Sequence, residues 1–160
     1  MDEVEKALAC AIRVLARRDH SVAELERKLH GKGVSAGVIA DLIVRLGKSG
    51  YLDDRRFAER WAESAVRNGR GYGPRLRLEL ARRGVSREII ADVLSGIAAA
   101  YGEEETLAAL MTRRFTGFDP TSASDRDRRR VAAYLQRRGF SAAVIFRFFR
   151  TWDDCRGDVE

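Results

Sequence analysis

The chain has 160 residues, of which 45% are hydrophobic and 34% charged, with only two prolines and two cysteines. A compact fold of this length buries roughly 68–70% of its unfolded surface, so it needs no disulfide or metal ion to hold it together. Thirty Lys and Arg residues against 24 Asp and Glu give a net charge of +6. That excess fits an anionic partner, such as nucleic acid or an acidic protein face, without identifying which, and solubility alone is an equally good explanation.

The cysteines and the N-terminus bear on the compartment. Cys10 and Cys155 form no C-x-x-C pair, and two isolated cysteines are typical of a reducing cytosol. No uncharged run reaches the ~18 apolar residues of a transmembrane helix. The acidic start, Met1 to Glu5, does not match a signal peptide. We therefore expect a cytoplasmic protein with no membrane partner.

Helix signals follow one another along the chain. An apolar pattern favours a helix from Val4 to Arg17, and Ser21-Val22-Ala23-Glu24 is a capping box that opens a second helix. The Asp53-Asp54 pair can cap a later helix that ends at residues 68–73, and Pro74 suits position N1 of its successor.

The last third of the chain shows a further helix start. Glu103 to Glu105 complement the N-terminus of a helix whose apolar face holds Leu107, Leu110 and Met111. Residues 117–124 form the longest predicted loop, and a polar tail at 154–160 is expected to fray.

Three segments of the chain read alike: Leu29 to Leu46, Leu80 to Ile97, and Leu135 to Trp152. Each contains a glycine, an apolar residue and a serine in succession, and the apolar positions beyond the serine also coincide. The matched turns are Gly33-Val34-Ser35, Gly84-Val85-Ser86 and Gly139-Phe140-Ser141. The matched apolar positions are Val38, Ile39, Leu42, Ile43 and Leu46; Ile89, Ile90, Val93, Leu94 and Ile97; and Val144, Ile145, Phe148, Phe149 and Trp152.

The repeated turn has a simple physical interpretation. Glycine at the C′ position accepts the left-handed conformation that ends a helix, so we predict positive φ at all three glycines. The serine then caps the next helix by accepting a backbone N–H bond, and the apolar residue before it forms a hydrophobic staple. Each segment is therefore two helices joined by a tight turn, and a third helix precedes each pair.

These patterns predict an all-α protein of nine helices in three tandem three-helix repeats. We place the repeats at 1–50, 51–102 and 103–153, followed by the tail at 154–160. A unit of this size buries its own apolar face poorly, so we expect the repeats to stack into an elongated array that can curve.

Few sequence patterns indicate a catalytic, metal-binding or cofactor-binding site. His20 and His30 lie near predicted helix ends without a cysteine or carboxylate at metal spacing, and we expect both at the surface. The recurring serines are caps, as are Asp53 and Asp54. Residues 69–73 lack the sequence of a dinucleotide or P-loop, which leaves a flexible turn or a loop that contacts a partner's backbone. We predict no catalytic residue, no metal and no cofactor.

The basic residues form the candidate site. An arginine pair precedes the glycine at both Arg82-Arg83 and Arg137-Arg138, and a repeated basic position on a stacked array would make a stripe suited to a phosphate backbone. Favourable interaction with the helix dipole is the competing explanation. We predict binding to nucleic acid or its protein filament through Arg70, Tyr72, Arg75, Arg77, Arg82, Arg83, Arg128, Arg130, Arg137 and Arg138.

The aromatic residues of the third segment are expected to replace aliphatic residues of the core. Phe146 matches Ala40 and Ala91 in the repeat frame, and we expect it to pack in the core or against the tail. Exposure as a partner contact is the alternative.

Several of these residues resemble the RecX family. They are Gly50-Tyr51-Leu52-Asp53-Asp54-Arg55-Arg56-Phe57-Ala58, Gly71-Tyr72-Gly73-Pro74 leading to Glu79-Leu80, Arg83-Gly84-Val85, and Arg137-Arg138-Gly139-Phe140-Ser141. The similarity runs in order over essentially the whole chain. The interval from Pro74 to Glu79 is one residue shorter than the family pattern, which leaves open whether Leu76, Arg77 or Leu78 faces inward.

The resemblance implies a regulator of the RecA recombinase. Such proteins are three tandem three-helix repeats that lie along the RecA–DNA filament groove and inhibit strand exchange, ATPase and coprotease activities. It also implies a role in recombination, DNA repair and the SOS response, weak contact with single- and double-stranded DNA regardless of sequence, and a monomer. Two other classes stay open: a DNA-binding transcriptional regulator of helix-turn-helix type, and a protein-binding helical scaffold.

Overall fold

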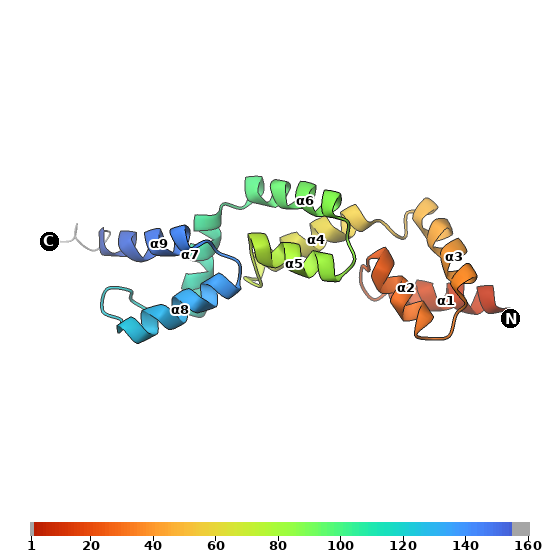
Figure 1. Cartoon of the computed structure of the whole chain (residues 1–160), viewed down its shortest axis with the longest axis horizontal. Helices are drawn as coiled ribbons and strands as arrows, with labels where there is room; N and C mark the ends of the chain where they lie inside the picture. Colours follow the sequence, from red (N-terminus) through yellow and green to blue (C-terminus); the bar gives the residue numbers. More distant parts are fainter. Residues whose placement is uncertain (1, 155–160) are drawn as a thin grey trace. The chain divides into compact units, whose positions relative to one another are not determined.

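The computed structural model describes residues 2–154, and these form nine α-helices and no strand (Figure 1). The prediction of an all-α chain is confirmed. The helices are α1 (Glu3–Leu15), α2 (Val22–His30), α3 (Ala36–Lys48), α4 (Asp54–Arg67), α5 (Gly73–Arg82), α6 (Arg87–Ala100), α7 (Glu103–Arg114), α8 (Asp125–Arg137) and α9 (Ala142–Asp154).

The chain divides into two compact units. The first contains Met1–Trp61 and Glu79–Val93, and the second contains Ala62–Leu78 and the chain from Leu94 onward. The boundary between them runs through α4, α5 and α6. The first unit therefore contains α1–α3 with parts of the middle helices, and the second contains the rest of those helices with α7–α9.

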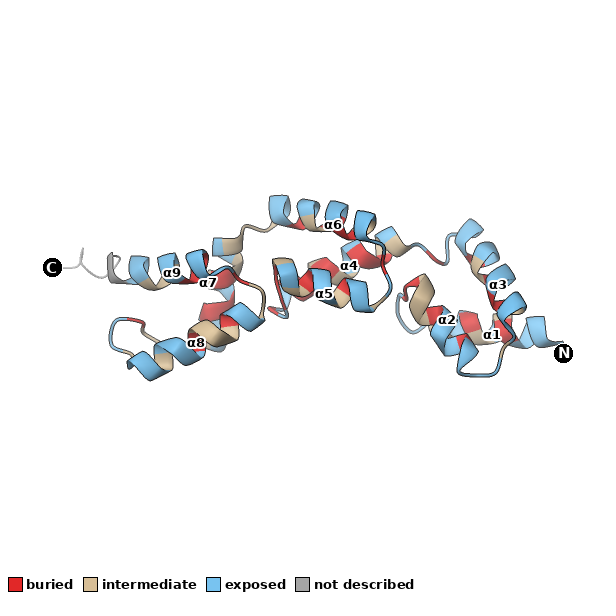
Figure 2. Ribbon diagram, in the orientation of Figure 1, coloured by how far each residue is buried: buried red, intermediate tan, exposed pale blue. Residues whose placement is uncertain are grey.

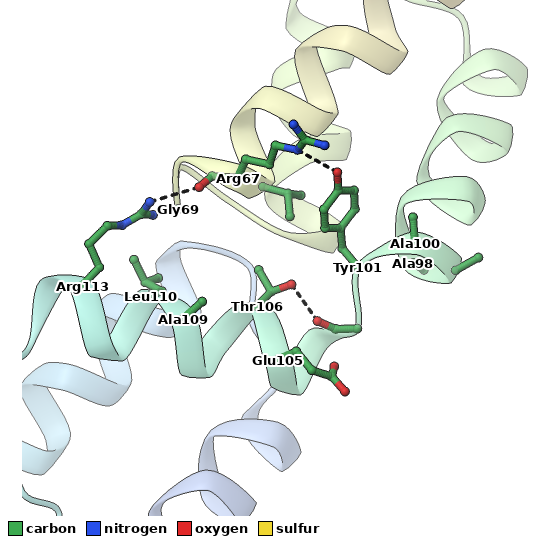
Figure 3. Close-up of a pocket in the computed structure, with 13 residues that line it drawn as sticks. Arg67, Gly69, Ala98, Ala100, Tyr101, Glu105, Thr106, Ala109, Leu110 and Arg113 are labelled. Carbon is green, nitrogen blue, oxygen red and sulfur yellow. Dashed lines mark hydrogen bonds between the residues drawn. The ribbon is translucent and has the colours of Figure 1, made fainter.

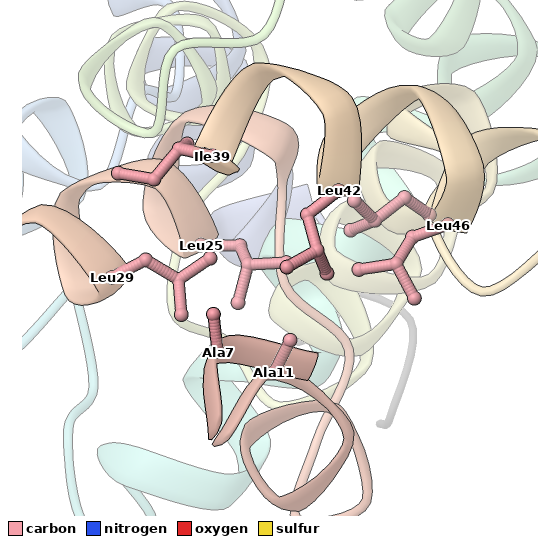
Figure 4. Close-up of a cluster of buried hydrophobic side chains, with 8 residues drawn as sticks. Ala7, Ala11, Leu25, Leu29, Ile39, Leu42 and Leu46 are labelled. Atoms are coloured by element: carbon pink, nitrogen blue, oxygen red, sulfur yellow. The ribbon is translucent and has the colours of Figure 1, made fainter. Parts of the chain in front are cut away.

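The core of the first unit lies among α1, α2 and α3 (Figure 4). Helix α1 contributes two small residues, Ala7 and Ala11, whereas α2 and α3 contribute mainly leucines. Small residues on one helix leave room for the long side chains of its neighbours, which fill the space at the density of a protein interior. The buried cluster consists of Ala7, Ala11, Leu25, Leu29, Ile39, Leu42, Leu46 and Leu52.

Burial follows the amphipathic pattern of each helix, so buried residues form one stripe and exposed residues the other (Figure 2). On α5, the stripe includes Leu76, which is fully buried, whereas Arg77 is exposed and Leu78 is largely exposed. This settles which residue of the shortened interval faces inward.

The three repeated glycines have positive φ angles, as predicted: 79° at Gly33, 77° at Gly84 and 96° at Gly139. At each turn the N–H of the next residue donates to the leucine carbonyl five positions earlier, at 3.3, 3.2 and 3.2 Å, which is the Schellman arrangement. The same arrangement ends α3 at Gly50 and α4 at Gly69. Nothing in the repeat pattern indicated these two further examples.

The predicted caps are mostly confirmed. Ser21, Ser86 and Ser141 accept N–H bonds from the first turns of their helices, and Asp53 accepts one from Arg56. The prediction for Ser35 is wrong, because it occupies the N-cap position but its side chain makes no capping bond. Its N–H instead donates to a carboxylate oxygen of Glu3 at 2.7 Å.

Two other expectations are corrected. His20 is only 5% exposed, because it lies where the chain turns from α1 to α2, whereas His30 is exposed as expected. Phe146 does not pack in the core: it is 65% exposed. Trp152 is also partly exposed, although Leu46 and Ile97 at the matching positions are buried. Cys155 and the tail after Asp154 lie outside the described residues.

Candidate nucleic-acid interface

Part of the predicted site comes together in the second unit. The N–H of Tyr72 donates to the carbonyl oxygen of Arg138 at 2.8 Å, and the Arg138 guanidinium donates to the carbonyl oxygen of Arg70 at 3.0 Å. The ring of Tyr72 stacks on Phe140 with centroids 5.6 Å apart. The loop before α5 and the turn after α8 therefore form one ordered junction, although they are far apart in sequence.

Tyr72 lies inside this junction and is only 8% exposed. Its hydroxyl donates to the carbonyl oxygen of Tyr101 at 2.6 Å. Burial raises the pKa of Tyr72, and the nearby charges of Glu103 and Glu105 act in the same direction. The geometry makes Tyr72 a residue that holds the loop carrying Arg70.

The two arginine pairs show the same division between their members. Arg82 and Arg137 are exposed, and the Arg82 side chain is 62% exposed. Arg83, in contrast, donates to the Glu79 carbonyl and carboxylate, both at 2.9 Å, and its guanidinium lies 4.5 Å from the centre of the Trp61 ring.

Arg138 is held in a similar way, since it binds the Arg70 carbonyl and its guanidinium lies 5.0 Å from the centre of the Tyr134 ring. The second arginine of each pair is thus held by contacts within the protein. The bond from Arg83 to a carbonyl of its own helix agrees with the helix-dipole explanation for that residue. The first arginine of each pair is exposed, and Arg82 also forms an ion pair with Glu79 at 3.5 Å.

The remaining predicted residues are on α5 and α8. Arg77 and Arg128 are exposed, and Arg130 is also exposed at 3.5 Å from a carboxylate oxygen of Asp127. Arg75 is half-buried beside the Gly139 turn. Arg82 and Arg83 belong to the first unit and the other predicted residues to the second, so a continuous basic stripe remains a prediction.

A pocket of about 540 Å³ lies in the second unit at the ends of α4 and α6 and along α7 (Figure 3). Tyr101 receives a bond from Arg67 at 2.9 Å and donates to Glu63 at 2.7 Å, while Arg113 donates to the Arg67 carbonyl at 3.1 Å. The polar groups of these residues are therefore paired with one another by hydrogen bonds. Glu105 also lines the pocket, and the Thr106 hydroxyl donates to the Gly102 carbonyl oxygen at 2.7 Å.

The first unit holds a second cavity that was absent from the predicted site, lined by basic residues of α1, α2 and the turns that follow them. A signal was present in the sequence: two pairs of cations, Arg13 with Arg17 and Lys28 with Lys32, are each spaced by four residues. Arg13 lies on α1 and Lys28 on α2, whereas Arg17 and Lys32 lie in the turns that follow these two helices.

Models of the RecX family match the chain three times, in order. The first three-helix domain of RecX matches residues 7–46, the second matches 53–94 and the third matches 102–149. The chain belongs to the RecX family.

Whole-chain comparisons agree with this membership. The regulatory protein RecX of Trichlorobacter lovleyi is 43% identical over 139 residues, covering 87% of this chain and 90% of the relative. That of Syntrophotalea carbinolica is 36% identical over 143 residues, covering 89% and 94%. The crystal structure of RecX from Lactobacillus salivarius shares the fold with a TM-score of 0.75, at 21% identity and with 95% of this chain and 97% of that chain covered.

The relatives carry the name regulatory protein RecX. Between residues 2 and 154, no three His, Cys, Asp or Glu side chains are grouped so that they could hold a metal ion. None of the helices in this part of the chain has the length and apolar character needed to cross a bilayer.

Proposed function

We propose that this chain binds the RecA–DNA filament and inhibits the recombinase, ATPase and coprotease activities of RecA, with weak contact to DNA regardless of its sequence. The observation that carries the proposal is the ordered match of all three RecX domains. The protein acts by occupancy and performs no chemistry of its own. We further propose that it is a cytoplasmic monomer, with repeats at 1–50, 51–102 and 103–153 as its binding units.

The exposed arginines supply the contact with phosphate groups or acidic side chains. Arg82 and Arg137 occupy equivalent positions in two repeats, and both are exposed. Arg82 forms an ion pair with Glu79 at 3.5 Å, which a phosphate or carboxylate of the partner would replace. Planar guanidinium groups suit phosphate and carboxylate oxygens, and little side-chain ordering is needed where the helix beneath is already fixed. Arg83 and Arg138 support the surface because they hold the turns in place.

The test measures ATP hydrolysis by RecA on single-stranded DNA with increasing amounts of the chain. The parent is expected to slow hydrolysis. Charge reversal in R82E/R137E should weaken inhibition at least about tenfold, because two contacts with an anionic surface become repulsive. The matched control, R45E/R150E, reverses two exposed arginines of α3 and α9 and should inhibit as the parent does.

Equal inhibition by the parent and R82E/R137E, with equal helical content by circular dichroism, would remove these arginines from the interface. A parent without effect on RecA would overturn the proposal and favour one of the other classes. Strong preference for one duplex sequence would indicate a helix-turn-helix regulator.

Salt dependence separates DNA contact from a purely protein-binding scaffold. Each phosphate neutralised on a single strand contributes about −0.7 to the slope of log affinity against log salt concentration. Fluorescence anisotropy of a labelled oligonucleotide should show a negative slope that becomes shallower in R82E/R137E. A flat slope for the parent would assign the chain to scaffolds that bind protein alone.

A further inference from the structure

A basic cleft of about 540 Å³ lies in the first unit, between the C-terminal part of α1, the turn that follows it and the end of α2. We use the name basic cleft for this cavity. Its charged lining consists of Arg13, Arg17, Arg18, Lys28 and Lys32, together with His20. No acidic side chain lines the cavity, and none of its lining residues is among the arginines proposed above to contact RecA or DNA.

Few of these positive charges are neutralised by the protein itself. Glu24 pairs with Arg18 at 2.9 Å. Asp19, which follows Arg18 in the sequence, pairs with Arg60 at 3.0 Å instead. Within residues 2–154, Arg17 and the two lysines form no ion pair with a carboxylate. Arg13 likewise forms none, and its guanidinium donates only to the Ala9 carbonyl of its own helix, at 3.3 Å.

Like charges around a concave volume repel one another, and the repulsion is relieved when an anion occupies the space between them. The same environment affects the pKa of His20. Burial lowers its pKa, and the positive charges of Arg18 and Lys28 act in the same direction. The imidazole Nδ1–H donates to the Arg18 carbonyl at 2.9 Å, which keeps the ring oriented at the edge of the cleft.

We propose that the basic cleft binds an oligophosphate, a short chain of phosphate groups such as the triphosphate of a nucleotide or inorganic tripolyphosphate. A compact ligand with several negative charges matches cations that surround one volume from two helices and the turns that follow them. Arginine offers a fork of donors to phosphate oxygens and lysine a point charge. No Phe, Tyr or Trp side chain lines the cleft, so it lacks the large aromatic rings on which bases stack in grooves that bind single strands. Recognition is therefore of the phosphates and not of the base.

Isothermal titration calorimetry of the full chain with tripolyphosphate tests this site directly. The parent should bind one equivalent, and K28Q/K32Q should bind at least about tenfold more weakly because two of the cations are lost. The control R45Q/K48Q removes the same net charge from the exposed end of α3, outside the cleft, and should bind as the parent does. Adenosine, which has no phosphate, should not bind, whereas ATP should bind as tripolyphosphate does.

Several outcomes would overturn the proposal. One is no binding of tripolyphosphate by the parent, and another is equal weakening in K28Q/K32Q and R45Q/K48Q, which would show attraction to net charge alone. A single-stranded oligonucleotide that binds and depends on Lys28 and Lys32, while tripolyphosphate does not bind, would assign the cleft to a nucleic-acid strand instead. These measurements use the chain without RecA or DNA filaments, so their failure leaves the proposed function standing.

Cys10 provides a second readout, because it lines the same cavity and is partly exposed. In a C155S background, saturating tripolyphosphate should slow alkylation of Cys10 by the neutral reagent iodoacetamide at least about threefold. The same addition should leave the rate unchanged when K28Q/K32Q is included. Alkylation that is equally fast with and without tripolyphosphate in the parent would place any bound anion outside the cleft and contradict the proposal.

Discussion

The turn at Gly33 and the turns at Gly84 and Gly139 share a backbone conformation but differ in their surroundings. A Cβ atom built on Gly33 would meet no atom within 4 Å. The same atom on Gly84 would overlap the Cβ of Ala23, and on Gly139 it would overlap the carbonyl oxygen of Tyr72. The first turn therefore requires glycine for one reason, its positive φ angle. The two later turns require it for two reasons, the φ angle and the lack of a side chain.

The difference arises because each later turn packs on the start of the second helix of the preceding repeat. In the first unit, the Ser21 hydroxyl donates to the carbonyl oxygen of Arg83 at 2.5 Å. In the second unit, the N–H of Tyr72 donates to the carbonyl oxygen of Arg138 at 2.8 Å. Arg83 and Arg138 occupy the same position in the repeat. Each contact between successive repeats, called a joint below, therefore uses the carbonyl oxygen of the equivalent residue as its hydrogen-bond acceptor.

The largest expected effect is that of Gly139→Ala. The left-handed conformation costs a non-glycine residue about 1–2 kcal/mol, and the overlap with a backbone oxygen adds the cost of moving two main-chain segments apart. We expect a loss of about 4 kcal/mol in the free energy of unfolding, measured by urea titration of the helical circular dichroism signal. A loss no greater than that of Gly33→Ala would show that the joint is not tightly packed.

Gly84→Ala should have an intermediate effect, about 3 kcal/mol, because the new methyl group meets another methyl group and α2 can move slightly to accommodate it. Gly33→Ala is the matched control, with the same φ and no neighbour, and should cost about 1 kcal/mol. The comparison fails if the two substitutions have equal effects on the urea midpoint.

Of the three substitutions at the joints, Ser21→Ala is expected to have the smallest effect. Ser21→Ala removes a helix cap and the donor to Arg83, which together should lower the free energy of unfolding by about 2 kcal/mol. Ser35→Ala is the control, since its side chain makes no capping bond, and should change stability by less than about 0.5 kcal/mol. Similar losses in both variants would mean that the Ser21 joint adds little to capping.

Features with a local cause could be predicted from the sequence, and features with a distant cause could not. The positive φ of the three glycines and the Ser21 capping box depend on a few adjacent residues, and both are confirmed. The bond from the Ser35 N–H to Glu3 on another helix does not explain the missing cap, because the Ser141 N–H binds Glu103 in the same way and Ser141 still caps its helix. The burial of His20 depends on packing that no local pattern contains.

The candidate site shows the same limit. Charge and repetition identified the arginine pairs, but they could not distinguish Arg82 from Arg83, because that difference depends on where Trp61 and Glu79 lie. The basic cleft was missed since its cations come from two helices and gather only after folding. Comparison of the repeats identifies only positions that recur, and the residues of the cleft belong to the first repeat alone.

The use of a main-chain carbonyl at each joint has a consequence for how the family can diverge. Every residue carries such an oxygen, so substitutions of the side chain at this position leave the joint's acceptor intact, provided that the glycine after it is kept. A chain built in this way can accumulate many changes and keep its helix arrangement. The crystal structure of RecX from Lactobacillus salivarius shares the fold at 21% identity.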